Sequence, residues 1–196
     1  MTLALDRQGQ DLLFLKARSV RSFSNEQVTD EQMRAIYDLV KFGPTAFNLS
    51  PLRITLVRSK QGRSRLLSHL SAGNRRKAQS APVTAILSTD LEFHEELPRL
   101  APHAVDVGSH LFASRQRRED SARLNGALQA GYFLIGVRAA GLAALPMTGY
   151  DSAGLAADFL DRDHLPLMVV SIGLPGPDPE HPRSPRLDYE EVVTIA

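Results

Sequence analysis

The sequence of 196 residues contains no cysteine, and its formal net charge is only +1. Without cysteine, the chain cannot form disulfides, thiolate metal sites or a cysteine nucleophile. The nearly balanced charge argues against nucleic acid or an anionic membrane surface as a partner. Apolar runs are also short, as at residues 166–174, whereas a helix needs about 20 residues to span a bilayer. We therefore expect a soluble, cytoplasmic protein that binds neither membrane nor nucleic acid.

Several familiar functional motifs are missing as well. No GxGxxG follows a strand, and no P-loop, GxSxG or HExxH occurs, so the usual signatures of a Rossmann unit, a phosphate loop, a hydrolase and a zinc protease are absent. His94, His103 and His110 lack the i, i+4 spacing of a helical metal pair, and we expect no metal site. The basic run at 74–77 lacks the interleaved aromatic residues that stack on nucleic-acid bases.

The composition is that of an ordered globular protein. Hydrophobic residues make up 43% of the chain and charged residues 23%, which together favour a packed core over disorder. No period of 20–50 residues repeats, so a solenoid is not expected. The length fits a single domain over 1–196, or one protomer of a dimer.

Hydrophobic periodicity and turn residues predict a mixed α+β order of elements. The N-terminal stretch carries Asp6, Arg7 and Asp11 and is typical of a helix, not of a signal peptide. Thr29 or Asp30 can cap the second helix. The expected elements are helices over 6–17 and 30–43, a strand over 53–59, two short helices over 62–81 broken at Ala72-Gly73, strands over 83–89 and 165–175, and a long helix over 121–142.

The long helix is apolar on most sides. Leu124, Leu128, Gly131, Ile135 and Ala139 recur along it at helical spacing. This pattern predicts a buried helix, at the core or at a subunit interface. Residues 90–120 are the least regular part of the chain, and we expect a loop-and-helix excursion that serves as a lid or as an interface element.

The residues that could carry chemistry are fragments suited to an anion. They are Arg18, Ser19 and Arg21; Asn74 and Lys77; and Arg183 and Arg186. An arginine fork suits phosphate oxygens, and a serine hydroxyl adds a donor. Two turns, 43–51 and 145–151, offer backbone donors together with Asn48 and Thr148. Caps, turns and surface arginines explain each fragment alone, but their coexistence favours a phosphorylated cofactor with a ring.

Five motifs in order over almost the whole chain resemble the nitroreductase family of FMN-dependent oxidoreductases. They are RSVRSF at 18–23, PTAFNLSP at 44–51, Asn74-x-x-Lys77, GLAALPMTGYD at 141–151 and RLDYEEV at 186–192. The resemblance implies an α+β nitroreductase-like fold, with a central, mostly antiparallel sheet flanked by helices, in an interwoven homodimer. It also implies FMN as cofactor, with NADH or NADPH as the electron donor.

The resemblance assigns roles to individual residues of this chain. The FMN phosphate would be held by Arg18, Ser19, Arg21 and Arg186. Asn74 and Lys77 would meet the polar edge of the flavin ring, where Lys77 could stabilise negative charge at N1/O2. The ring's inner face would lie on Pro146, Met147, Thr148 and Gly149, with a backbone N–H near N5. Pro44, Thr45 and Asn48 would come from the other protomer.

Some positions depart from the family pattern, and some departures indicate a branch. Ser50 stands where many members have glutamine, and Arg183 is out of register with a lysine of some members. Segments such as GPTxxNxSP and RxPRLxxEE resemble the malonic semialdehyde reductase branch. That resemblance implies ping-pong reduction of malonic semialdehyde to 3-hydroxypropanoate by NAD(P)H through flavin N5.

Other interpretations stay open at this point. The same scaffold could serve as a general nitro- or quinone reductase, as a flavin-binding protein without turnover, or as a cofactor-free interaction domain. Arg115, Arg117 and Arg118 could bind the acceptor's carboxylate, or could form an ordinary solvated charge run. We find no obvious general acid, so the catalytic residues are unknown.

Overall fold

The computed structural model describes residues 3–177 and 182–196 of the chain. Up to the second strand the elements are α1 (Arg7–Gln10), the π-helical turn η1 (Asp11–Leu15), α2 (Asp30–Val40), η2 (Ala46–Asn48), β1 (Leu52–Val57), α3 (Lys60–His69), α4 (Ala72–Ala78) and β2 (Val83–Asp90). The rest are η3 (Phe93–Glu96), α5 (Leu97–Leu100), η4 (Pro102–Ala104), α6 (Val105–Leu111), α7 (Arg115–Ala139), β3 (Ala143–Met147), α8 (Ser152–Phe159), β4 (His164–Gly173) and α9 (Tyr189–Val192).

The sheet at the centre has four strands in the order β1-β2-β4-β3, and each pair of neighbours is antiparallel. The middle strands are the apolar runs of the sequence: in β2, all residues from Val83 to Thr89 are buried. A strand that is buried on both faces must be covered by helices on both sides. The edges are formed by β1, which is mostly half-buried, and by β3, in which Pro146 alone is exposed.

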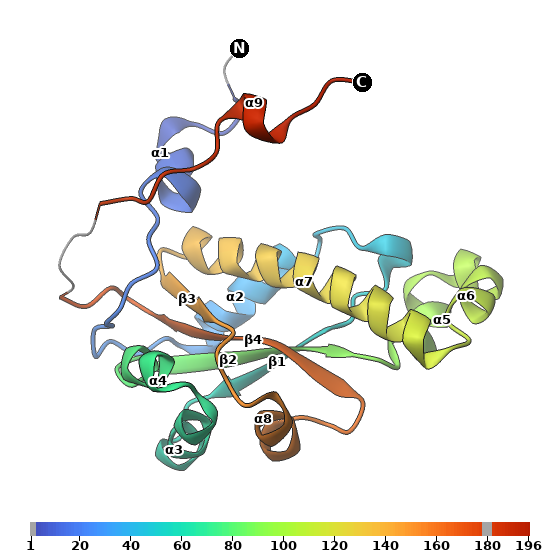
Figure 1. The fold of residues 1–196 in the computed structure, drawn as a ribbon, viewed down its shortest axis with the longest axis horizontal. Helices are drawn as coiled ribbons and strands as arrows, with labels where there is room; N and C mark the ends of the chain where they lie inside the picture. Colours follow the sequence, from blue (N-terminus) through green and yellow to red (C-terminus); the bar gives the residue numbers. More distant parts are fainter. Residues whose placement is uncertain (1–2, 178–181) are drawn as a thin grey trace.

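Helices cover the two faces separately (Figure 1). On one face α2 and α7 bury Ile36 and Phe133 against Val83 and Val170 of the sheet. On the other, α3, α4 and α8 pack onto Ile86 and its neighbours in a second apolar cluster. This layered α+β architecture is the one expected from the order of the elements.

The irregular segment that follows β2 is an ordered module. Short helices η3 to α6 gather around their own cluster, in which Phe93 and Phe112 meet edge to face with ring centroids 5.0 Å apart. Leu49, from the turn before β1, is buried in the same cluster. The module is therefore fastened to the 44–51 turn.

Some boundaries predicted from the sequence were wrong. The segment 143–147 is the strand β3, not part of a turn, and it was missed because Pro146 interrupts its pattern; an edge strand tolerates proline, since its outer side needs no donor. α8 was also missed. The long helix begins at Arg115, so the charged run 115–120 is its first turns. Thr29 caps α2 through a capping box, as predicted.

The two ends of the chain form what we call the terminal arm, made of α1, η1 and residues 182–196 (Figure 1). Arg183 joins the N-terminal and C-terminal segments of the arm by donating to the carbonyl oxygens of Phe14, Leu15 and Ala17, at 3.1, 2.8 and 2.9 Å. Among the described residues, no helix has both the length and the apolar character needed to cross a membrane.

The crossing of α2 over α7 generates a stability prediction. A Cβ at Gly136 would lie 2.3 Å from Cγ1 of Val40, on a β-branched side chain that has little rotamer freedom in a helix. We expect Gly136→Ala to lower the free energy of unfolding by about 1–3 kcal/mol in denaturant titrations. Val40→Ala in the same chain should restore most of the loss, because it removes the clashing methyl. An unchanged midpoint in the single variant would contradict this packing.

Candidate functional site

The segment that carries Arg18, Ser19 and Arg21 runs without regular secondary structure from η1 into the body. It is anchored at its far end, where Phe23 is 4% exposed and forms a bridge with Pro175. The Phe23 N–H also donates to the Ser80 hydroxyl, at 3.0 Å, just beyond α4. The polar residues before this anchor are left exposed at the edge of the sheet that β3 forms.

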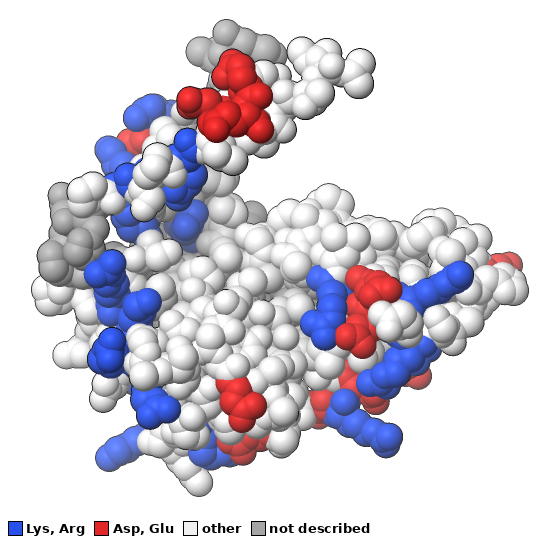
Figure 2. Space-filling view, in the orientation of Figure 1, with Lys and Arg blue, Asp and Glu red and all other residues white. Residues whose placement is uncertain are grey.

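Arginines from three parts of the chain converge beside this segment. Arg138, in the last turn of α7, donates to the Leu13 carbonyl oxygen at 2.9 Å. The pKa of Arg183 lies below its usual range because of desolvation and because of repulsion from Arg18, Arg186 and Arg138. Figure 2 shows basic side chains gathered where the terminal arm meets the body, whereas acidic side chains gather at α9. The arginines therefore repel one another and would be stabilised by an anion.

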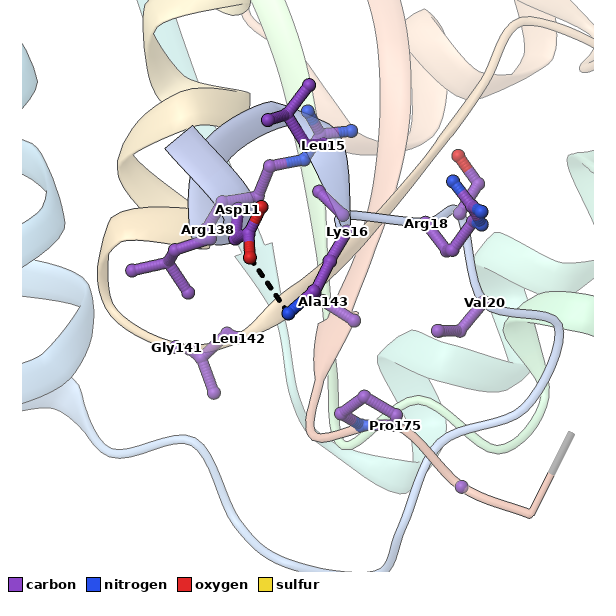
Figure 3. A pocket seen from close by; sticks show the side chains of 14 residues that line it. Asp11, Leu15, Lys16, Arg18, Val20, Arg138, Gly141, Leu142, Ala143 and Pro175 are labelled. Carbon is purple, nitrogen blue, oxygen red and sulfur yellow. Dashed lines mark ion pairs between the residues drawn. The ribbon is translucent and has the colours of Figure 1, made fainter. Parts of the chain in front are cut away.

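A cavity of about 610 Å³ opens between the terminal arm and the start of β3 (Figure 3). Lys16, Arg18 and Arg138 are the cations of its lining. Lys16 is neutralised by Asp11 at 2.8 Å. Within residues 3–177 and 182–196, the Arg18 guanidinium has neither a hydrogen-bond nor an ion-pair partner. Arg138 contacts a neutral carbonyl oxygen, so Arg18 and Arg138 both keep a positive charge that a ligand could use.

The other fragments predicted for this site meet at α4. The Asn74 amide donates to the Gly149 carbonyl oxygen at 3.1 Å, and a Cβ at Gly149 would lie 2.8 Å from the Asn74 side-chain nitrogen. A larger residue at this position would displace the Asn74 amide. Lys77 lies on the same face of α4, half-buried and without a carboxylate partner in the described part of the chain. An ammonium in that position favours a negatively charged neighbour.

The end of β3 presents its backbone to the open edge of the sheet. Pro146 and Thr148 are exposed, but the Met147 side chain is only 4% exposed and packs into the core under the sheet. A ligand on this edge could therefore meet Met147 only through its main chain.

Pro44, Thr45 and Asn48 lie elsewhere, on the turn that leads into β1 at the opposite edge of the sheet. The three inter-strand spacings between β1 and β3 amount to about 14 Å. This turn lines a second cavity, of about 1170 Å³, which shares no residue with the first. Within one chain, these residues do not join the others.

The turn is strained. Phe47, Asn48 and Ser50 have φ angles of 50°, 54° and 43°, in the left-handed region that favours glycine. A non-glycine residue pays about 1–2 kcal/mol there. The Thr45 hydroxyl accepts from the Ser50 N–H at 3.2 Å, and the Tyr132 hydroxyl donates to the Pro44 carbonyl oxygen at 3.1 Å. Such strain persists only where the surroundings hold it, and it is common at functional sites.

The arginines proposed for an acceptor's carboxylate are largely engaged elsewhere. Arg115 pairs with Asp163 at 3.1 Å, and Arg118 pairs with Glu92 at 3.2 Å. Sequence reasoning also missed Arg138, whose place beside Arg18 depends on how η1 packs against the end of α7. No local pattern could have indicated it.

Known proteins resemble the chain in sequence and in fold. The model of the nitroreductase family matches residues 15–174. A Streptomyces griseus protein, provisionally named an NADH dehydrogenase/NAD(P)H nitroreductase, is 62% identical over 194 residues, which cover 99% of each chain. A provisional nitroreductase of Bacillus subtilis superimposes with a TM-score of 0.85 at 21% identity, covering 94% of this chain and 97% of its own. A provisional nitroreductase of Exiguobacterium sibiricum, solved in complex with FMN, has a TM-score of 0.82 at 20% identity, covering 100% of this chain and 99% of its own.

The unbalanced charge at the first cavity predicts that anions stabilise the protein. At low ionic strength, inorganic phosphate should raise the melting temperature by several degrees more than chloride does at equal ionic strength, by binding only the folded chain. Arg18→Ala should remove at least half of this difference. Lys60→Ala removes an equal charge from an exposed site at α3 and serves as the control. Equal responses in the two variants would contradict a specific anion site.

Proposed function

We propose that this chain, which belongs to the nitroreductase family, is an FMN-dependent oxidoreductase that takes electrons from NADH or NADPH and reduces a small acceptor. The observation that carries the proposal is the arginine cluster around Arg18, whose guanidinium has no other partner among the described residues. The FMN bound by a protein of the same fold supports the choice of ligand.

The residues present fit the phosphate end of this cofactor. Arg18, Arg186 and the Ser19 hydroxyl would take the phosphate oxygens, and Arg21 lies on the same exposed segment. Arg183 would add positive charge while its own donors hold the terminal arm together. A dianion here relieves the mutual repulsion of these guanidinium groups.

The residues at the end of β3 and on α4 fit the ring. The Asn74 Nδ2 donates to the Gly149 carbonyl oxygen, and the side-chain carbonyl oxygen of Asn74 would accept a hydrogen bond from the ligand. Lys77 would supply a positive charge near the ring's polar edge, while Pro146, Thr148 and the Met147 backbone would form its floor. When bound, the flavin supplies two-electron transfer between the nicotinamide and the acceptor. The chain itself contributes position and electrostatics.

Two copies of the chain would complete each site. Pro44, Thr45 and Asn48 lie at the edge opposite to the other site residues, so a second protomer would bring its own turn to them. Exposed apolar side chains on the α2 and α7 side support such a homodimer; they include Tyr37, Leu39, Phe42, Leu124 and Leu128.

The acceptor we propose is malonic semialdehyde, reduced to 3-hydroxypropanoate, and the support for it is the sequence motifs of that branch. Because Arg115 and Arg118 are paired, a different cation would have to bind the acid of this substrate. A second candidate is a general nitro- or quinone reductase, which the names of the relatives favour.

Flavin retention and acceptor profiling test the proposal. Purified protein incubated with FMN and desalted should keep its flavin absorbance and lose it on anaerobic addition of NADH or NADPH. The kcat/KM for malonic semialdehyde should then exceed that for quinones and nitrofurans by at least about tenfold, equal to 1.4 kcal/mol of transition-state preference. The reverse order would favour the general reductase. Flavin that is retained but not reduced would indicate a flavin carrier, and no retained flavin would refute the proposal.

Light scattering tests the dimer. We expect a particle of twice 21.5 kDa. Leu124→Glu should shift it toward monomers and weaken FMN binding, because a carboxylate would be buried where an apolar contact forms. Ala157→Glu, on the exposed side of α8, should leave both unchanged. A monomer that binds FMN as tightly as the wild type would contradict the shared site.

A further inference from the structure

Asn125 is an unusual residue on the inner face of α7. It is 4% exposed, whereas the other buried residues of this helix are alanine, glycine, phenylalanine and valine. Asparagine is a poor residue for a helix interior, and a buried amide is tolerated only when its polar atoms are satisfied. Both polar atoms of the Asn125 amide make hydrogen bonds. Its Nδ2 donates to the Ser121 carbonyl oxygen at 2.9 Å, and its Oδ1 accepts from the Ala46 N–H at 2.8 Å.

The Ala46 contact falls at the start of the strained turn. Directly after it come Phe47 and Asn48, both with positive φ angles, and no regular ladder holds them. The turn also contacts the η3 to α6 module: the Asn48 amide donates to the Leu100 carbonyl oxygen at 2.9 Å, and the Phe47 ring meets the buried Phe112 ring edge to face. Asn125 ties the turn to the interior of the protein.

The direction of the turn's remaining donors depends on this tie. The Thr45 hydroxyl accepts from the Ser50 N–H, so its own proton is free to point outward. Asn48 has one N–H engaged by Leu100 and keeps its other N–H and its carbonyl oxygen. These groups can meet a ligand at fixed positions only if the backbone that carries them is fixed.

We propose that Asn125 is a positioning residue for the flavin site, which holds the turn of one protomer in the geometry that meets the flavin bound by the other. This inference rests on the proposed function. Asn125 touches neither the flavin nor the acceptor, and it acts through the Ala46 N–H.

Substitutions of similar shape separate this role from packing. Asn125→Leu removes the amide and keeps the branched shape of the side chain. Asn125→Asp keeps an oxygen that accepts from Ala46, and its second oxygen takes the place of the amide nitrogen that donates to the Ser121 carbonyl oxygen at 2.9 Å. It can replace that donor only when the carboxyl is protonated. The matched control is Gln129→Leu. Gln129 lies one turn further along α7, and its side-chain oxygen accepts from the Leu52 N–H at 3.0 Å, after the strained turn.

Two measurements on the full-length protein give the test: hydrogen exchange of the 43–50 amides without flavin, and FMN affinity by fluorescence quenching. Asn125→Leu should speed exchange at Ala46 and the residues after it and raise the FMN Kd about tenfold, the loss of one buried hydrogen bond. At about pH 5, where a buried carboxyl is protonated, Asn125→Asp should restore the Kd to within about threefold of wild type at the same pH, and the rescue should fade as the pH rises. The phosphate-dependent rise in melting temperature should stay unchanged, because the Arg18 side of the site is intact.

The outcomes discriminate between the two proposals. Faster exchange with an unchanged Kd would overturn the role of Asn125 in flavin binding and leave the proposed function standing. An equal rise in Kd for Gln129→Leu, or no rescue by Asn125→Asp at about pH 5, would reduce Asn125 to general packing. Wild-type protein that binds no FMN would overturn the proposed function, and the role of Asn125 with it.

Discussion

A four-stranded antiparallel sheet separates its two edge strands by about 14 Å, with the inner strands between them. The residues suited to a ligand are attached to both edges: Arg18, Asn74 and Gly149 lie on the β3 side, and the 44–50 turn lies on the β1 side. In the proposed function, a single chain would therefore present two half-sites. The exposed apolar side chains of α2 and α7 would then pack between the two copies of the chain, and the turn would reach the site of the partner copy.

Two features of the chain are energetically unfavourable: the repulsion among the arginines near Arg18 and the backbone strain of the 44–50 turn. Guanidinium groups converge beside Arg18, where desolvation and mutual repulsion lower the pKa of Arg183. Three non-glycine residues of the 44–50 turn adopt left-handed backbone. Each feature costs free energy in the isolated chain, and the hydrophobic core of the sheet and its covering helices supplies the stability that tolerates both. A bound phosphate would offset the repulsion among the arginines. The hydrogen bond from the Ala46 N–H to Asn125 holds the strained turn in place.

The sequence predicted that α7 is an apolar helix, but not which of its sides faces the sheet. Its periodic stripe was predicted to be buried, yet Leu124 is 73% and Leu128 43% exposed in the protomer, while Ala122, Asn125 and Phe133 face the core. The helix is apolar on two sides, and periodicity alone does not say which side meets the sheet. The hypothesis of a subunit interface for the outer stripe stays a prediction.

The sequence by itself determined the α+β class, the buried strands β2 and β4, the cap at Thr29 and the family, because these depend on local composition, on periodicity and on motifs in order. Only the tertiary structure decided that Pro146 lies in an edge strand, that Arg138 and Arg183 join Arg18, and that Asn125 meets Ala46. Those contacts join residues that are far apart in the chain, and their geometry follows from how α7 crosses the sheet and how the terminal arm folds back.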